Sequence, residues 1–267
     1  IKWKRARNLG KDIETGNAKH SKEKMRLFAG KIEPSDICQG SLGDCWLLAA
    51  IACVAEENSD KIKSLFLTRE ADAFSCYQVR LFDKHSHRWR TLTIDDRVPV
   101  RSDGAPYFSN PHGNELWVLL LEKAYAKIYK SYGAISGGDI GEALRDLTGS
   151  PVFSWRLDHK EGKHMVQTGE MWKKICATHQ NQDLLCCGYC SSNEVEIQKF
   201  NKGQEKIKDG PKIVPNHAYA IVDVSEKGKG VLKLRNPWGH LNSVDGNNND
   251  GCFLMPYDKW NKIFRHL

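Results

Sequence analysis

The chain has 267 residues, of which 40% are hydrophobic and 27% charged, with a net charge of +7. This is the composition of a globular protein with room for one large domain or two lobes. No apolar run approaches the ~20 residues of a membrane span and no signal-peptide pattern opens the chain, so we expect no membrane span. The basic residues are dispersed among acidic ones, which indicates a solvated surface and not a nucleic-acid site.

Nine cysteines, an odd number, lack the regular spacing of a secreted disulfide scaffold. This favours a reducing, intracellular setting, and we expect a cytoplasmic protein. The chain opens with Ile1 and not with Met. We therefore expect it to be a segment of a longer protein that carries additional domains.

The first strong pattern along the chain is QGSLGDCWLLAA, residues 39–50. Gly40 and Gly43 predict a turn, Asp44 is suited to an N-cap, and the apolar residues that follow predict a helix. Cys45 then falls in the first helical turn, where unpaired backbone N–H groups favour negative charge. With a basic partner nearby, such a setting lowers a thiol pKa from ~8.5 to ~3.5–7.5. The pattern predicts a nucleophilic cysteine.

The remaining elements divide the chain into a helix-rich first half and a strand-rich second half. Alternating residues predict a hairpin of strands at 77–82 and 89–94, and helical spacing predicts a helix over 114–129. Residues 136–138, Ser-Gly-Gly, form a flexible junction. The second half is predicted to contain strands at 184–189, 218–224, 231–235 and 252–255, helices at 169–178 and 257–264, and a mobile loop over 191–215.

Two segments of the second half offer a base and a residue to orient it. His217 lies at the start of a predicted strand, and Asn236 lies where the next strand ends in a Pro-Trp-Gly turn. A nucleophile, a base and an orienting group that are distant in sequence but convergent in space are typical of Cys-His-Asn hydrolases.

Taken together, QGSLGDCWLLAA, NHAYAIVDV and LRNPWG, in this order, resemble the protease core of the calpains, which are calcium-dependent, papain-like cysteine proteases. The segments GNELWVLLLEKAYAKIYKSYGAISGG, DLTGS and DGCFLMPYDKW extend the resemblance over nearly the whole chain. It implies an α+β, papain-like fold of two lobes with the cleft between them. Residues 1–138 would form the helical N-terminal lobe with the nucleophile. Residues 139–267 would form the antiparallel, β-rich C-terminal lobe with the histidine and the asparagine.

The residue types then predict a mechanism. Cys45 and His217 would form a thiolate–imidazolium pair across the cleft, and the thiolate would attack a peptide carbonyl while His217 protonates the leaving amine. Asn236 would accept a hydrogen bond from the second imidazole nitrogen. Gln39 would donate to the oxyanion alongside the Cys45 backbone N–H. Trp238 would cover the His–Asn hydrogen bond.

The resemblance also implies two calcium sites built from carboxylates and backbone carbonyls, the ligands that this hard cation prefers. At the first site the ligands would be Asp36 and Glu115, with loop carbonyls near residues 29–31. The alternative is a purely structural role, with Asp36 as a helix N-cap and Glu115 as an ordinary acid at a helix start.

The second implied calcium site is depleted of charge. Asp250 aligns with a family carboxylate and Asp245 is a looser candidate, but Asn242 and Cys252 stand where carboxylates are expected. Backbone carbonyls cannot replace lost charge, so we expect this site to be weak or absent.

The function expected from these observations is a calcium-dependent cysteine endopeptidase that performs limited proteolysis of intracellular proteins. The leading alternative is a calpain-like scaffold or regulatory module with little proteolytic activity. A transglutaminase-type acyl transferase is disfavoured because it normally orients its histidine with Asp. A zinc site remains a minor alternative, formed by the pairs Cys176/His179 and Cys187/Cys190.

Overall fold

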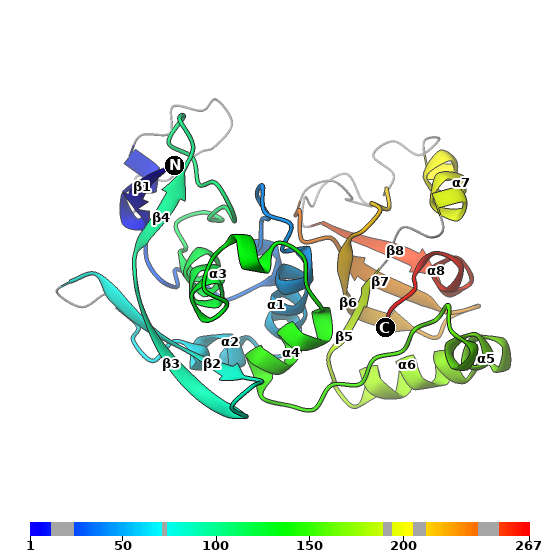
Figure 1. Ribbon diagram of the computed structural model, residues 1–267. Helices are drawn as coiled ribbons and strands as arrows, with labels where there is room; N and C mark the ends of the chain where they lie inside the picture. Colours follow the sequence, from blue (N-terminus) through cyan, green and yellow to red (C-terminus); the bar gives the residue numbers. More distant parts are fainter. Residues whose placement is uncertain (12–23, 71–73, 189–193, 205–211, 240–250) are drawn as a thin grey trace.

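The computed structural model describes residues 1–11, 24–70, 74–188, 194–204, 212–239 and 251–267 (Figure 1). Its elements gather on two sides of a central helix, α1. On one side of α1 lie two antiparallel two-stranded sheets together with several helices. On the other side lies a four-stranded antiparallel sheet. The mixed α+β class and the papain-like architecture predicted from the sequence are therefore confirmed.

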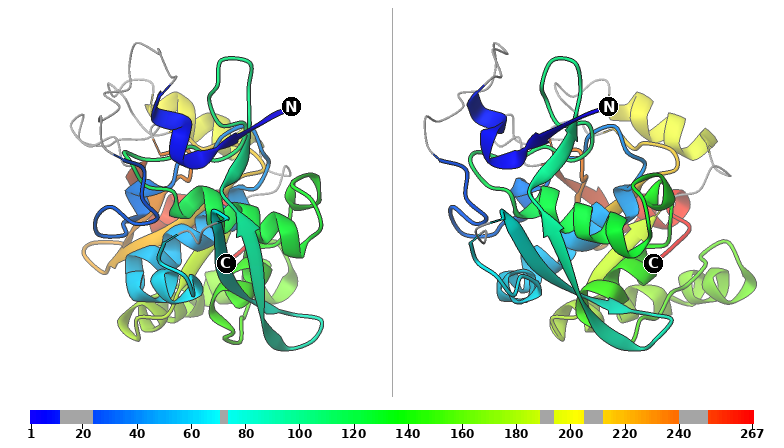
Figure 2. Two further views of the ribbon diagram at one scale, coloured as in Figure 1. Left: turned by 90° about the vertical axis from the view of Figure 1, so that its left-hand side faces the viewer. Right: turned by 60° about the vertical axis from the view of Figure 1, so that its left-hand side comes forward.

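The first side contains two antiparallel strand pairs, β1 with β4 and β2 with β3. Its elements are β1 (Lys2–Arg5), α1 (Cys45–Glu57), α2 (Ser59–Leu65), β2 (Cys76–Asp83), β3 (Arg88–Asp95), β4 (Arg97–Val100) and α3 (Trp117–Ile128). Figure 2 shows the β2–β3 hairpin along the outer side of the molecule, away from the four-stranded sheet. The predicted hairpin is present in the structure, and its strands are slightly longer than the predicted ones.

The second side is organised around the sheet β5-β6-β7-β8, in which every neighbouring pair is antiparallel. Its elements are α5 (Lys160–Thr168), α6 (Glu170–Gln180), β5 (Leu185–Gly188), α7 (Glu194–Gln204), β6 (Ala218–Ser225), β7 (Val231–Arg235), β8 (Cys252–Pro256) and α8 (Tyr257–Ile263). The four predicted strands match these positions to within one residue at most ends.

The strands β5 and β6 are buried on both faces, and their side chains alternate between two cores. Cys186, Ala218 and Ala220 belong to the cluster built on α1. Tyr219 and Ile221 belong to the cluster under α6 and α8. Because α1 packs directly on one face of the sheet, the helix that begins with Cys45 lies against the strand that follows His217.

Helix α4 (Ile140–Thr148) packs mainly against α1 and β2. Its buried residues Ala143, Leu144 and Leu147 belong to the same core as α1. Thus the first residues after the Ser-Gly-Gly junction lie beside the elements of the first half. The division between lobes at residues 138 and 139 stays a prediction.

One local prediction is wrong, and one predicted helix is shorter than expected. The segment 191–215 is not a loop throughout, because α7 occupies Glu194–Gln204 and buries Ile197. The helix predicted over 114–129 is present but begins only at Trp117, because the backbone at Glu115 and Leu116 pairs with Arg26. Among the described residues, no helix has both the length and the apolar character needed to cross a membrane.

Candidate active site

Cys45 is the first residue of α1, and Asp44 is its N-cap. The loop before it is packed too tightly for a side chain at Gly40, since a Cβ there would lie 1.5 Å from the Phe108 carbonyl oxygen. The backbone N–H groups of Ala218 and Trp46 act on the half-buried Cys45 thiol and favour its ionised form. The thiol therefore faces both the free N–H groups of the helix start and the strand that follows His217.

His217 and Asn236 are brought together by the antiparallel neighbours β6 and β7. His217 Nε2 lies 2.7 Å from Asn236 Oδ1, and both residues are buried. Since the Asn236 oxygen can only accept, this contact assigns the proton to Nε2 and leaves Nδ1 without one in the neutral ring. Asn236 Oδ1 also accepts from the Trp238 backbone N–H at 3.0 Å.

Trp238 lies beside the histidine, with ring centroids 4.8 Å apart and planes tilted by 53°. The Pro-Trp-Gly turn that carries it depends on Gly239, whose φ of +81° is in the left-handed region. A Cβ at Gly239 would also lie 3.2 Å from Cys38 Sγ. The turn thus places the indole beside the His217 ring.

The protonation states differ from those expected from the sequence. Burial raises the pKa of the Cys45 thiol and the charge of Asp44 adds to this, although the neighbouring backbone N–H groups act in the opposite direction. Burial also lowers the pKa of His217 to about 4, although its hydrogen bond with Asn236 acts in the opposite direction. In this conformation both groups are therefore neutral at pH 7, and the expected thiolate–imidazolium pair is not formed.

Two hydrogen bonds join the segment before Cys45 to the end of β7 and the turn that follows it. The Gln39 backbone N–H donates to the Pro237 carbonyl at 3.1 Å. The fully buried Arg235 donates from Nη2 to the Ile37 carbonyl at 3.0 Å. These bonds couple the position of the nucleophile loop to the position of the asparagine turn.

The Gln39 side chain points into its own loop. Its Nε2 donates to the Leu42 carbonyl at 2.7 Å and lies 3.4 Å from Asp44 Oδ1. One of its two N–H bonds is thus occupied by the loop. Its carboxamide must therefore turn before it can donate fully to a substrate oxyanion.

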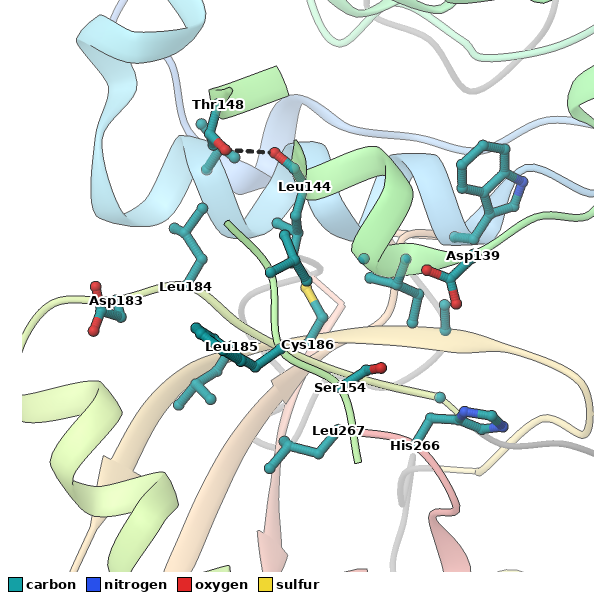
Figure 3. Close-up of a pocket in the computed structure, with 18 of the residues that line it drawn as sticks. Asp139, Leu144, Thr148, Ser154, Asp183, Leu184, Leu185, Cys186, His266 and Leu267 are labelled. Atoms are coloured by element: carbon teal, nitrogen blue, oxygen red, sulfur yellow. Dashed lines mark hydrogen bonds between the residues drawn. The ribbon is translucent and has the colours of Figure 1, made fainter. Parts of the chain in front are cut away.

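A cavity of about 1100 Å³ has Cys45 and His217 among its lining residues. It extends from them between α4 and β5 to the C-terminal residues. Figure 3 shows this part of the cavity, with Leu144 and Thr148 on the α4 side and Cys186, His266 and Leu267 on the sheet side. The cavity therefore contains both predicted reacting groups and has room for an extended peptide.

The two acids of the first predicted calcium site lie side by side. Trp117 Nε1 is 3.3 Å from Asp36 Oδ2 and 3.1 Å from Glu115 Oε2. Glu115 Oε1 accepts from the backbone N–H groups of Ala29 and Gly30, both at 2.6 Å. Burial raises the pKa of Glu115, and the neighbouring Asp36 adds to the effect.

Of the second predicted calcium site, Asn242, Asp245 and Asp250 lie outside the described residues, and Cys252 begins β8. Within the described part of the chain, no group of three or more His, Cys, Asp or Glu side chains is arranged to hold a metal ion. Of the zinc alternative, Cys176 is on α6 and Cys187 is fully buried in β5, while Cys190 lies outside the described residues.

Sequence reasoning missed two buried charged residues behind the site. Arg235 ends β7 next to Asn236, and Glu122 on α3 faces Asp44. Glu122 follows the apolar run 117–121, and this is the signal that would have marked it, whereas Arg235 lies in a mixed segment and has no such signal.

Comparisons with known proteins agree with the geometry. Residues 1–267 match the family described as "Calpain family cysteine protease". The chain is 32% identical over 266 residues to the calpain-type cysteine protease DEK1 of Zea mays, covering 99% of this chain and 11% of that protein. It is 31% identical to the calpain-2 catalytic subunit of Gallus gallus and to human calpain-8, covering 85% and 89% of this chain and 31% and 32% of those proteins. The chain thus spans about a tenth to a third of the length of these relatives.

Proposed function

Because the chain belongs to the calpain family of cysteine proteases, we propose that it is an endopeptidase that uses Cys45, His217 and Asn236 as a catalytic triad. The observation that carries this proposal is the 2.7 Å contact between His217 Nε2 and Asn236 Oδ1 in the cavity that Cys45 also lines. Its expected substrates are intracellular proteins cut at limited sites, and further domains of the same chain are expected beyond these residues.

The hydrogen bond to Asn236 determines which histidine nitrogen reacts. Nε2 is protonated and donates a hydrogen bond to Asn236. Nδ1 is therefore the nitrogen that can take the proton of Cys45. As Sγ attacks the peptide carbonyl, the S–H proton passes to Nδ1, and Nδ1 then gives it to the leaving amine. Water activated by Nδ1 releases the acyl group from Sγ. Because the Cys45 thiol and the His217 imidazole are both neutral at the start, the proton moves from Sγ to Nδ1 while Sγ attacks the carbonyl.

Two donors are available to the oxyanion. The Cys45 backbone N–H lies at the start of α1, where it has no intrahelical partner. Gln39 would supply the second donor once its Nε2 turns from the Leu42 carbonyl. Removing one such donor typically costs ~10²–10³ in rate.

We further propose that Ca²⁺ promotes this activity at Asp36 and Glu115. These carboxylates lie close enough to serve one ion, since Trp117 Nε1 is 3.3 Å from Asp36 Oδ2 and 3.1 Å from Glu115 Oε2. Burial and the Asp36 charge raise the pKa of Glu115, and a bound cation would act against both. When bound, Ca²⁺ would supply positive charge between η2 (Pro34–Asp36) and Glu115, which lies two residues before α3. Asp36 directly precedes the loop Ile37–Gln39. An ion that fixes Asp36 would therefore also restrict the position of Gln39, the oxyanion donor. We propose at most a weak second site at Asp250.

The test is hydrolysis of a fluorogenic peptide during a calcium titration, with Cys45→Ser as the inactive control. Glu115→Gln should weaken calcium binding measured by calorimetry and move the activity curve to higher calcium, whereas the exposed Glu170→Gln should change neither. Activity that persists in Cys45→Ser would refute the triad. Activity without any calcium response would refute the calcium role alone.

Labelling of Cys45 distinguishes an active peptidase from the alternative, a scaffold without activity. A peptidyl epoxide should alkylate Cys45 in the wild type and not in His217→Ala, because alkylation needs the thiol to lose its proton. Absence of both labelling and hydrolysis would favour the scaffold.

A further inference from the structure

One buried indole joins the two carboxyl groups proposed above as calcium ligands. Trp117 is the first residue of α3 and has none of its surface exposed. Its Nε1 lies 3.3 Å from Asp36 Oδ2 and 3.1 Å from Glu115 Oε2. An indole nitrogen carries one hydrogen and can only donate. The two acids therefore share this single N–H group.

Backbone donors from two other segments hold the same carboxyl groups. Glu115 Oε1 accepts from the N–H groups of Ala29 and Gly30, both at 2.6 Å. Asp36 Oδ2 accepts from the Glu33 N–H at 2.9 Å. The acids thus connect residues 29–30, η2 and the start of α3. Among the described residues, the indole N–H is the donor that contacts both acids.

These donors use lone pairs that a cation would also need. A carboxylate offers about four lone-pair sites. On Glu115, two backbone N–H groups and the indole use three of them. On Asp36, one backbone N–H and the indole use two, and His112 Nδ1 lies 3.3 Å from Oδ1. Ca²⁺ takes about 6–8 oxygen ligands, so an ion bound to both acids competes with these donors, and most directly with the N–H that both acids share.

The shared N–H also reduces the repulsion between the two acids. Burial raises the pKa of Glu115, and the charge of Asp36 adds to this. A hydrogen bond donated to both carboxylates offsets part of the repulsion, as a cation between them would. Loss of the N–H would leave more repulsion for an ion to relieve and would free one lone pair on each acid. Both effects predict tighter calcium binding when the indole N–H is removed.

We propose that the Trp117 indole N–H takes the bridging place between Asp36 and Glu115 and thereby lowers the affinity of this site for Ca²⁺. The proposal rests on the calcium role proposed above for these two acids. It assigns Trp117 no contact with substrate, because the side chain is fully buried. Trp117 is thus a residue that tunes the site and not a ligand of the ion.

The test is a calorimetric titration of CaCl₂ into the wild-type chain and into Trp117→Phe, which keeps an aromatic ring at this place and removes the N–H. Because a hydrogen bond to a charged group is worth about tenfold or more in an equilibrium constant, the calcium Kd of the variant should be about tenfold lower than that of wild type. An equal or higher Kd in the variant would overturn the proposal, since the indole would then not compete with the ion.

The matched control is Trp260→Phe. Trp260 on α8 is also fully buried, but it packs against Tyr257 and Phe264 in the core of the second side. Its replacement should lower Tm without changing the calcium Kd, and a Kd lowered as much as in Trp117→Phe would overturn the proposal. A second replacement guards against failure of Trp117→Phe to fold. Benzothienylalanine in place of Trp117 keeps the size of the indole but has sulfur where the N–H was, so an unchanged Kd there would also overturn the proposal.

An independent readout is the ¹H–¹⁵N NMR signal of the Trp117 indole, which needs no turnover and is identified by its loss in Trp117→Phe. It should move as CaCl₂ is added and follow the calorimetric binding curve. A signal that stays fixed while calcium binds would overturn the proposal. If neither wild type nor the variants bind calcium, the proposed calcium role fails and this proposal with it, while hydrolysis that depends on Cys45 still decides the peptidase function.

Discussion

Asn236→Ala tests the central contact of the site. The substitution removes the acceptor of a 2.7 Å hydrogen bond and leaves the Nε2–H of His217, a residue 5% exposed, without a partner. An unsatisfied buried donor costs ~1–3 kcal/mol. At ~1.4 kcal/mol for each tenfold change in rate, kcat should fall about 5- to 150-fold. Asn236 itself is fully buried and offers no surface to substrate, so KM should change little.

The assay is steady-state hydrolysis of a fluorogenic peptide, with circular dichroism to show that the variant is folded. The control is Asn201→Ala in the same half of the chain. Among the described residues, Asn201 bonds the Ile213 backbone, at 2.8 and 3.0 Å, so its loss should lower stability without lowering kcat. A folded Asn236→Ala with kcat within twofold of wild type would refute the orienting role, and an equal loss in both variants would show that the effect is structural.

Three further predictions follow from burial and packing. His217 has its pKa lowered to about 4, so the unfolded chain takes up this proton first and the free energy of unfolding should decline between about pH 6.5 and pH 4. The decline, measured by urea denaturation, should be smaller in His217→Ala, and an equal decline would contradict the burial argument. Gly40→Ala forces a Cβ into a backbone carbonyl and should lower Tm, while Gly203→Ala, in α7 with open space around it, should keep or raise Tm. Arg235→Met removes the buried bond to Ile37 and should lower both Tm and kcat, whereas the exposed Arg88→Met should change neither.

Local signals in the sequence were sufficient for the elements that carry the reacting groups. The Gly-rich turn, Asp44 and the apolar run after Cys45 predicted α1 to its first residue, because a cap and a helix-forming run act within a few residues. The alternating segment after His217 and the Pro-Trp-Gly turn after Asn236 likewise predicted β6 and β7 and their ends. The order of these three motifs also indicated the family.

Other elements lacked a decisive local pattern. Residues 194–204 are polar and rich in lysine, so their helix was mistaken for a loop, although Ile197 is anchored in the core. The helix α4 follows a flexible Ser-Gly-Gly junction, and only its packing shows that it lies against α1. In both cases tertiary contacts select a helix that the local sequence specifies weakly.

The sequence by itself therefore determined the identity of the candidate reacting residues, because backbone propensity and side-chain chemistry are local properties. The tertiary structure decided their states. Burial makes Cys45 and His217 neutral where the sequence predicted an ion pair, and packing directs Gln39 into its loop. Desolvation and through-space charge depend on which residues surround a group, including Glu122 on a distant helix, and only the folded chain brings those residues together.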